Sequence, residues 1–355
     1  MSEANIDEIL ENETAEEEGG ELYEHIRIVV DKGQALERID TFLTNHIQNI
    51  SRNRVQNAAK AGNILVNEKA VKQNYKVKPN DVISIVFSYP PRETDIKPQQ
   101  IPLEIVYEDD DVIVINKQAG LVVHPGHGNF DGTLLNGLAY HFEQTRQNVE
   151  NKFGYLVHRI DKDTTGLLLV AKNETAQAIL ARQFFDHSID RRYQTIVWGN
   201  IVEDEGTVES NICRDPSDRT AFKVTFDEDK GKHAVTHYRV LERFGYVTLL
   251  ECKLETGRTH QIRVHMAHLG HPIFGDERYG GMEIRKGTIY AKYKQFIRNC
   301  FEICPRQALH AKTLGFVHPV TGKWLQFDSR IPEDMTALLE KWRKYSGLMP
   351  EEDEE

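Results

Sequence analysis

The feature that most constrains this chain is an apolar run that begins directly after a charged segment. The run is Gly166-Leu167-Leu168-Leu169-Val170-Ala171, and it closely follows His158-Arg159-Ile160-Asp161. An uninterrupted apolar run of this length is typical of a strand buried on both faces of a sheet. Asp161 should therefore lie at the mouth of a buried strand, where an ionised carboxylate is stable only if a cation compensates it.

A second charged segment, about a hundred residues further on, offers that cation. It reads Glu255-Thr256-Gly257-Arg258-Thr259-His260-Gln261-Ile262-Arg263-Val264-His265. The residues 259–269 predict a short helix that Gly270 ends. Ile262, Met266 and Leu269 have the spacing of a face turned to the core, and we expect Arg263 on the same helix to reach Asp161.

The expected pair of Asp161 and Arg263 has two interpretations. It is either a passive buried salt bridge, which the pattern alone slightly favours, or an ionised, oriented carboxylate suited to nucleophilic or electrostatic catalysis. Asp163 follows two residues after Asp161 and makes a two-carboxylate glycosidase site conceivable. Turn or cap chemistry is the more economical role for Asp163.

The charge of the chain is concentrated at its ends. The net charge of −11 includes ten acidic groups in residues 1–24 and five in residues 351–355. Without these fifteen groups the body carries a net charge of +4. We expect residues 1–24 and 346–355 to be acidic, disordered tails, whose role is either solubility or screening of a basic surface.

The four cysteines form no CxxC pair, which suits reduced thiols in the cytoplasm. No apolar run approaches the roughly twenty residues that span a bilayer, and the N-terminus lacks a secretory pattern. A soluble, cytoplasmic chain with no membrane association is therefore expected.

Residues 25–88 predict a small basic domain. We expect a strand at 26–30, a helix over 35–43 with Leu36, Ile39 and Leu43 on its apolar face, a second helix capped by Ser51, and strands at 64–67 and 81–86. Between Arg52 and Lys78 there is a single acid, Glu68, and seven basic residues. This surface either binds phosphates or is simply a solvated polar face. The seven basic residues are Arg52, Arg54, Lys60, Lys69, Lys72, Lys76 and Lys78.

Residues 89–101 contain three prolines and predict a linker, and residues 102–345 predict a larger domain. Its strands are expected at 111–116, 166–171, 193–198, 236–240 and 246–254, and its further helices at 173–187 and 332–345. These elements lack a regular βαβ rhythm. We therefore predict an α+β fold with a mixed, largely antiparallel extended sheet flanked by helices.

Two further groups of residues suggest chemistry. His260, His265, His268 and His271 cluster in sequence, but they point to different faces and no HExxH or CxxC completes a zinc site, so we predict no metal. Tyr193, which follows Arg191-Arg192, is either a core tyrosine or a platform on which a base stacks, beside arginines that could hold phosphates.

Residues 38–83 resemble the α-L RNA-binding domain. The resemblance rests on Arg38-Ile39-Asp40-Thr41-Phe42-Leu43, Ser51-Arg52-Asn53-Arg54-Val55-Gln56, 62–67 and 76–83. Glu68 and Asn80 stand where glycine is usual in that pattern, in turns that asparagine adopts more easily than glutamate.

The chain from about 25 to 342 resembles the RluA/RluD family of RNA pseudouridine synthases. The matching segments are 158–172, Arg192-Tyr193 leading to Gly199, 254–280, 306–311 and 318–322. Residues 122–129 resemble the branch that modifies large-subunit ribosomal RNA. Departures are mild: Ile160, Thr165, Arg191 and Gln118 replace commoner residues, and none removes a charge that the chemistry needs.

The resemblance implies a metal-free and cofactor-free reaction on RNA, carried out by a monomer. A uridine would lose its glycosidic bond, and the uracil would rotate and rejoin through carbon. Asp161 would be the catalytic carboxylate, Arg263 its partner, and Tyr193 would stack on the flipped uracil. Arg159 would fill the gap left in the RNA stack. The remaining residues expected to bind RNA are His158, Arg258, Arg52, Arg54 and Lys60.

Two other classes compete with this interpretation. A non-catalytic RNA-binding assembly factor would use the basic domain and a dead site, but Asp161, Tyr193 and Arg263 are all present. A metal-dependent hydrolase would have to use the histidines and bind zinc.

Overall fold

The computed structural model describes residues 23–47, 52–87, 96–126, 129–145, 152–218, 221–227 and 230–347. Two compact units make up the chain, with the division between Ile96 and Lys97. The acidic segments expected to form tails lie almost entirely outside the described residues, as do Ser51 and most of the proline-containing segment.

The N-terminal unit packs two helices on a small antiparallel sheet with strand order β1-β6-β3-β4, and a β2-β5 pair lies beside it. Its apolar core includes Phe42, Leu43, Val55 and Ile64. The elements are β1 (Tyr23–Val29), β2 (Glu37–Arg38), α2 (Ile39–His46), α3 (Arg52–Lys60), β3 (Ile64–Val66), β4 (Lys69–Ala70), β5 (Lys76–Val77) and β6 (Val82–Phe87).

The helix expected over 35–43 was placed too early. Residues 37–38 pair with β5, so α2 starts at Ile39, and Leu36 is 65% exposed instead of facing the core. The spacing of Leu36 and Ile39 was misleading, because the residues between them form a short strand and not the first turn of a helix. The glycine-like positions were identified correctly: Glu68 and Asn80 both have φ of 66°.

The larger unit is built on one eleven-stranded sheet. Its strands are β7 (Glu104–Glu108), β8 (Val112–Lys117), β9 (Tyr155–Leu156), β10 (Thr165–Ala171), β11 (Asp190–Trp198), β12 (Glu205–Arg214), β13 (Phe222–Thr225), β14 (Lys232–Arg243), β15 (Val247–Leu254), β16 (Leu309–Val317) and β17 (Trp324–Asp328). Its helices are α4 (Leu134–Gln144), α5 (Glu174–Phe185), α6 (Gln261–His268), α7 (Ala291–Ile303) and α8 (Glu333–Ser346).

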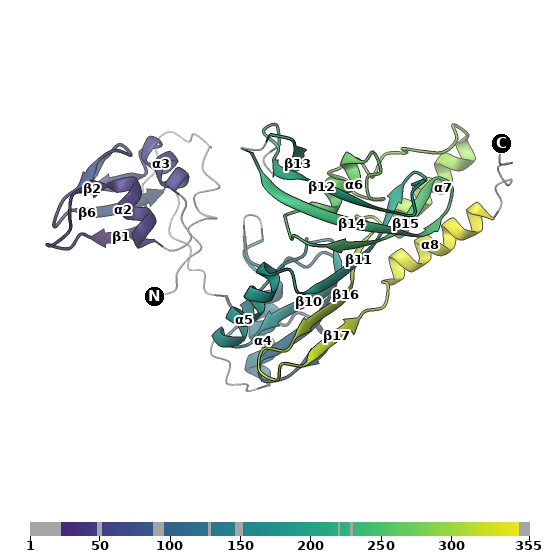
Figure 1. Ribbon diagram of the computed structural model, residues 1–355, viewed down its shortest axis with the longest axis horizontal. Coiled ribbons are helices and arrows are strands. Elements are labelled where there is room, and N and C mark those ends of the chain that lie inside the picture. Colours follow the sequence, from purple (N-terminus) through teal and green to yellow (C-terminus); the bar gives the residue numbers. More distant parts are fainter. Residues whose placement is uncertain are drawn as a thin grey trace. The chain divides into compact units, whose positions relative to one another are not determined.

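The strand order is β13-β12-β14-β15-β11-β16-β10-β8-β7, with β17 on β16 and β9 on β10 (Figure 1). Only the β10–β16 pair is parallel among the described strands, so the predicted α+β fold with a largely antiparallel sheet is confirmed. All seven residues of β10 are buried, because the strand is central and both of its faces are covered.

Helices cover the sheet at its two ends (Figure 1). Ala176 and Leu180 of α5 pack with Leu167 and Leu169 of β10, and the side chain of Asn173 caps this helix as predicted by accepting from Ala176 N at 2.8 Å. At the other end, Trp342 of α8 lies edge-on to Trp198 of β11. No helix within the described residues combines the length and the apolarity that a membrane crossing requires.

Candidate active site

Asp161 lies in the short loop that leads into β10. The loop turns tightly, with Thr164 N donating to Asp161 O at 3.1 Å. Two buried basic side chains hold its backbone: Lys117 Nζ donates to Lys162 O at 2.8 Å and Arg306 Nη1 donates to Asp163 O at 3.0 Å. Because both carbonyl groups within the turn are held, the backbone that carries Asp161 is fixed directly before β10.

Arg263 joins Asp161 to a second carboxylate. Its Nη1 donates to Asp161 Oδ2 at 3.0 Å, which confirms the predicted pair. Its Nε and Nη2 grip both oxygens of Asp276, at 2.7 and 2.9 Å. The Tyr279 ring lies 5.0 Å from the guanidinium carbon. Burial acts to lower the pKa of Arg263, but the hydrogen bonds and charges of Asp276 and Asp161 raise it overall, so the side chain stays charged.

The helix that carries Arg263 differs from the prediction at both ends. It starts at Gln261, because His260 has a left-handed backbone with φ of 55° and Gln261 Oε1 accepts from Arg258 N at 3.0 Å. Ile262 and Met266 are buried as expected, whereas Leu269 is 39% exposed. Leu269 follows the last helical residue, where the chain turns away toward Gly270.

A cavity of about 540 Å³ opens beside this ion pair. Asp161, Arg263 and Tyr193 all line it, although they come from a loop, a helix and a strand far apart in sequence. Tyr193 is 6% exposed. Burial and the Asp161 charge raise the pKa of Tyr193 against an opposing effect of Arg191, so the phenol remains protonated.

The three residues expected to bind RNA near Asp161 line the same cavity. Arg159 is exposed and makes one long hydrogen bond to Thr259 Oγ1, at 3.5 Å. Arg258 is exposed, and its Nε donates to His233 O at 2.9 Å. His158 packs on Phe184 and accepts a hydrogen bond from Leu169 N through Nε2. The two arginines thus keep donors free at the rim for a ligand.

The other expected RNA-binding residues belong to the N-terminal unit. Arg52 and Lys60 are exposed at the two ends of α3, and Arg54 lies on the same helix with its side chain outside the description. Arg52 Nε donates to Asp40 at 3.2 Å. Hydrogen bonds from Arg38, Gln56 and Arg52 hold the pKa of the buried Asp40 carboxyl well below its usual range.

The histidines of 260–271 do not converge on one point. His265 is buried between Ser210 Oγ and Thr236 Oγ1, His271 Nδ1 contacts Trp198 O, and His260 Nδ1 contacts Tyr279 Oη. Burial lowers the pKa of His260 to about 4 against the opposing charge of Asp161. Three of the four rings are thus occupied in local hydrogen bonds, and the exposed His268 ring lies 5.7 Å from the Phe226 ring.

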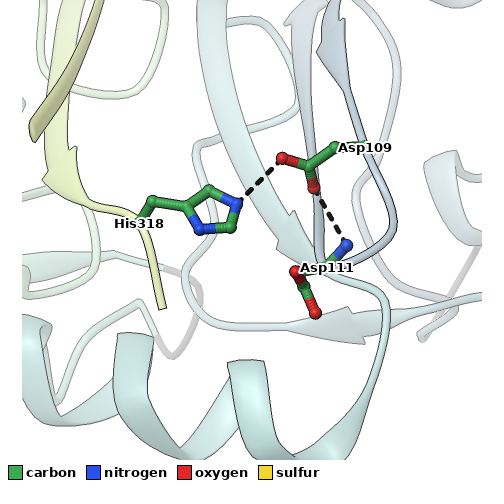
Figure 2. Close-up of side chains that lie close together, drawn as sticks. All are labelled: Asp109, Asp111 and His318. Carbon is green, nitrogen blue, oxygen red and sulfur yellow. Dashed lines mark hydrogen bonds and ion pairs between the residues drawn. The ribbon is translucent and has the colours of Figure 1, made fainter. Parts of the chain in front are cut away.

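A different group does gather acidic and histidine side chains, at the opposite end of β8 and β10. Figure 2 shows Asp109, Asp111 and His318, whose ligand atoms lie within 4.8 Å of one another. His318 Nε2 contacts Asp109 Oδ2 at 2.8 Å, while its Nδ1 accepts from Val320 N and Thr321 N. Because both ring nitrogens are in use, these residues form a clamp between two turns.

Sequence reasoning missed Asp276 as a site residue, and it named Arg191 and Arg192 together as possible phosphate ligands without deciding which of them faces the site. Asp276 is fully buried and fixes Arg263, and Arg191 lines the cavity beside Tyr193. The sequence did offer a signal for Asp276. It is an acidic residue in the segment 270–280, three residues before Tyr279-Gly280. Alternation along β11, which places Arg191 on the same face as Tyr193, was the signal for Arg191.

Comparison with known proteins gives the family. The family model described as RNA pseudouridylate synthase matches residues 111–268, and the S4 domain model, which corresponds to the α-L module, matches residues 37–83. An uncharacterized RNA pseudouridine synthase of Chlorobaculum parvum is 46% identical over 318 residues, covering 88% of this chain and 96% of the relative.

Two further relatives agree. Ribosomal large subunit pseudouridine synthase D of Zymomonas mobilis is 43% identical over 85% of this chain and 92% of its own length. The structure of human RNA pseudouridylate synthase domain containing 4 has the same fold, with a TM-score of 0.55 at 23% identity over 68% of this chain and 93% of that one. This chain therefore belongs to the RNA pseudouridine synthases, isomerases that act on RNA, and carries an S4 domain ahead of its catalytic domain.

Proposed function

We propose that this enzyme converts uridine to pseudouridine in large-subunit ribosomal RNA, with Asp161 as its catalytic carboxylate. The observation that carries the proposal is the Asp161 carboxylate, held at 3.0 Å by Arg263 inside a cavity that Tyr193 also lines. The names of relatives that are 41–43% identical support the choice of ribosomal RNA. The S4 domain and the exposed basic side chains of α3 supply a surface for phosphates.

The chemistry breaks the bond between the sugar C1′ and N1 of uracil, and forms a bond from C1′ to C5. Asp161 can attack the sugar, add to the base or remove a sugar proton, and each of these roles needs an unprotonated carboxylate. Arg263 donates a hydrogen bond to that carboxylate, and Asp276 keeps Arg263 in place.

A base can enter this cavity only after it leaves the RNA stack, at a cost of a few kcal/mol. The Tyr193 ring would recover part of that cost by stacking on the flipped uracil. Arg159, exposed at the rim, would occupy the vacated position in the stack. His158 and Arg258 would contact the flanking nucleotides.

Three further features of the enzyme belong to the proposal. The enzyme would act as a monomer, without a metal or cofactor in the reaction, through Asp161, Tyr193, Arg263 and Asp276. All four cysteines are free thiols, which supports a cytoplasmic location. The proposed domain organisation is an RNA-binding domain at 25–88, a linker at 89–101 and a catalytic domain at 102–345, with acidic tails at 1–24 and 346–355.

Asp161→Asn tests the catalytic assignment. The variant keeps the size and hydrogen bonds of the side chain, so it should bind precursor ribosomal RNA like the wild type while producing no pseudouridine. Pseudouridine mapped in RNA from a strain lacking the enzyme identifies the uridine, and reintroducing either protein tests its restoration. Full restoration by Asp161→Asn, or a missing pseudouridine in transfer RNA alone, would contradict the corresponding part of the proposal.

A further inference from the structure

Arg191 is a buried guanidinium in the active-site cavity that has no carboxylate partner. It is 8% exposed and lines the cavity with Tyr193. Within the described residues its Nε has no hydrogen-bond acceptor, and no carboxylate lies within ion-pairing distance of it. Its neighbour Arg192 is on the opposite face of β11 and is paired with Asp190 and with Glu251, at 3.3 and 3.1 Å.

A second unused donor packs against the same aromatic ring as Arg191. The Arg191 guanidinium carbon is 5.0 Å from the Phe184 ring centre, and the His158 ring is 4.7 Å from that same ring. His158 Nε2 accepts from Leu169 N, so the proton of the neutral ring is on Nδ1. In the described part of the chain Nδ1 has no acceptor, although it is buried.

Buried donors without acceptors are costly, and an unpaired buried charge is the costliest. Arg263 differs from Arg191 because two carboxylates already neutralise it. Arg191 therefore needs a ligand that brings both acceptors and negative charge. A uracil carbonyl would bring acceptors alone, whereas a backbone phosphate brings both and matches the planar fork of a guanidinium.

We propose that Arg191, assisted by His158, forms a phosphate-binding subsite that takes an RNA backbone phosphate next to the flipped uridine. The inference rests on the proposed function, because the phosphate reaches the cavity together with the nucleotide. Phe184 is the spacer that holds the two donors, and Gly257 opposite leaves room, since a Cβ there would lie 3.1 Å from Arg191 Nη1. The subsite would place the sugar so that its C1′ faces Asp161.

The test measures binding of a synthetic hairpin containing the uridine that the wild-type enzyme converts. All proteins carry Asp161→Asn so that the RNA stays unchanged. Arg191→Gln should weaken binding about tenfold, as expected for one charge-assisted contact. It should also reduce the slope of log K against log salt by about 0.7–0.9. Arg191→Lys should keep the slope, and Arg192→Gln, the matched control on the other face, should keep both affinity and slope.

A neutral methylphosphonate at either linkage flanking that uridine tests the contact on an unaltered protein fold. One of the two linkages should weaken binding by the protein with Arg191, and cause no further loss with Arg191→Gln. The inference would be overturned if the methylphosphonate weakened binding equally with both proteins, or if Arg191→Gln left the salt slope unchanged. Weaker RNA binding by Arg191→Gln at an unchanged salt slope would indicate a contact to the base instead. Failure of the wild-type enzyme to convert uridine in ribosomal RNA would contradict the proposed function and not this contact.

Discussion

Arg263 is the residue on which the geometry of the site depends, because it joins the partly exposed carboxylate of Asp161 to the buried carboxylate of Asp276. Asp276 has no exposed surface and takes two of the guanidinium hydrogen bonds, which leaves Nη1 for Asp161. A buried charge stays in place only when its partners are all present. Asp276 is therefore a positioning residue that acts on Asp161 through Arg263.

Asp276→Asn tests this relay. The amide keeps the shape but removes the charge and one acceptor, so we expect a loss of about 3 kcal/mol in the free energy of unfolding. We expect kcat to fall by about 100-fold, equivalent to about 2.7 kcal/mol, with little change in the Kd for RNA. Urea unfolding and single-turnover kinetics measure the two effects.

Glu242→Gln provides the control for that variant. Glu242 also accepts two arms of an arginine, Arg343, but this pair is on the surface. Exposed pairs contribute about 0–1 kcal/mol, so both stability and kcat should stay near the wild-type values. An Asp276→Asn enzyme with wild-type kcat would show that Arg263 needs no second carboxylate.

At the scale of elements, the central strand and the loop of Asp161 are connected at Gly166. Here β10 runs parallel to β16, and Gly166 has φ of 112°. A Cβ on Gly166 would lie 2.2 Å from Ala311 O, which no real side chain tolerates. The glycine thus allows β16 to approach the strand immediately after the loop of Asp161.

Gly166→Ala should destabilise the enzyme by about 3 kcal/mol or more, because backbone atoms of β16 must move. Thermal unfolding gives the size of the effect. Gly270→Ala is the matched comparison: its φ is also positive, at 81°, but nothing lies within 4 Å of the added Cβ. This variant should lose only about 1–2 kcal/mol of unfolding free energy, the cost of placing a residue with a side chain in the left-handed region. Similar losses for the two variants would contradict the steric argument.

The elements that the sequence could predict are those whose pattern is set by burial. β8, β10, β11 and β15 were expected from apolar runs, and their bounds differ by a few residues only. Several elements were not expected, among them β17 and α4. β17 is exposed or half-buried throughout, so its existence depends on pairing with β16. Leu134, Leu138 and Phe142 of α4 recur at the helical spacing of four residues and are buried, so this helix could have been expected from its sequence.

The same distinction holds for the site. Asp161 and Arg263 could be predicted as a pair because each breaks an apolar pattern, where a charge needs compensation. Arg191 could not be separated from Arg192 by residue type, since only the strand and its faces decide which of the two enters the cavity. The sequence contains the alternation, but the expected strand began at residue 193, two residues too late to include Arg191.

For the whole molecule, buried neutral histidines predict sensitivity to acid. Burial lowers the pKa of His265 and of His310 to about 4. The unfolded chain, with an ordinary pKa of about 6.5, therefore takes up protons first as the pH falls. The stability from these groups is complete above pH 6.5, approximately, and is lost progressively toward pH 4.

His265→Gln should make the pH dependence of unfolding less steep. Removing one such group lowers the slope between about pH 6 and 4.5 by up to roughly 1.4 kcal/mol per pH unit. Urea unfolding at several pH values measures this slope, and His237→Gln on the exposed face of β14 serves as the control. An unaltered slope for His265→Gln would mean that other groups account for the acid sensitivity.

The negative net charge of the chain and its RNA substrate are compatible only if local charge decides binding. In the N-terminal unit Arg52, Lys60, Lys69, Lys72, Lys76 and Lys78 are all exposed. Each phosphate that such a residue neutralises releases counterions, and this makes the affinity depend on salt. The overall charge of −11 has no comparable effect, because salt screens charges more than about 10 Å away.

Arg52→Ala, Arg54→Ala and Lys60→Ala together should therefore weaken RNA binding and lower the slope of log K against log salt by about two to three. Arg38 and Gln56 still hold Asp40 in this variant, so the unit should remain folded. Lys292→Ala, Lys294→Ala and Arg298→Ala remove the same charge from exposed positions of α7. If both triple variants lower the slope equally, net charge and not the α3 surface governs binding; a change confined to the first triple identifies α3 as the phosphate contact.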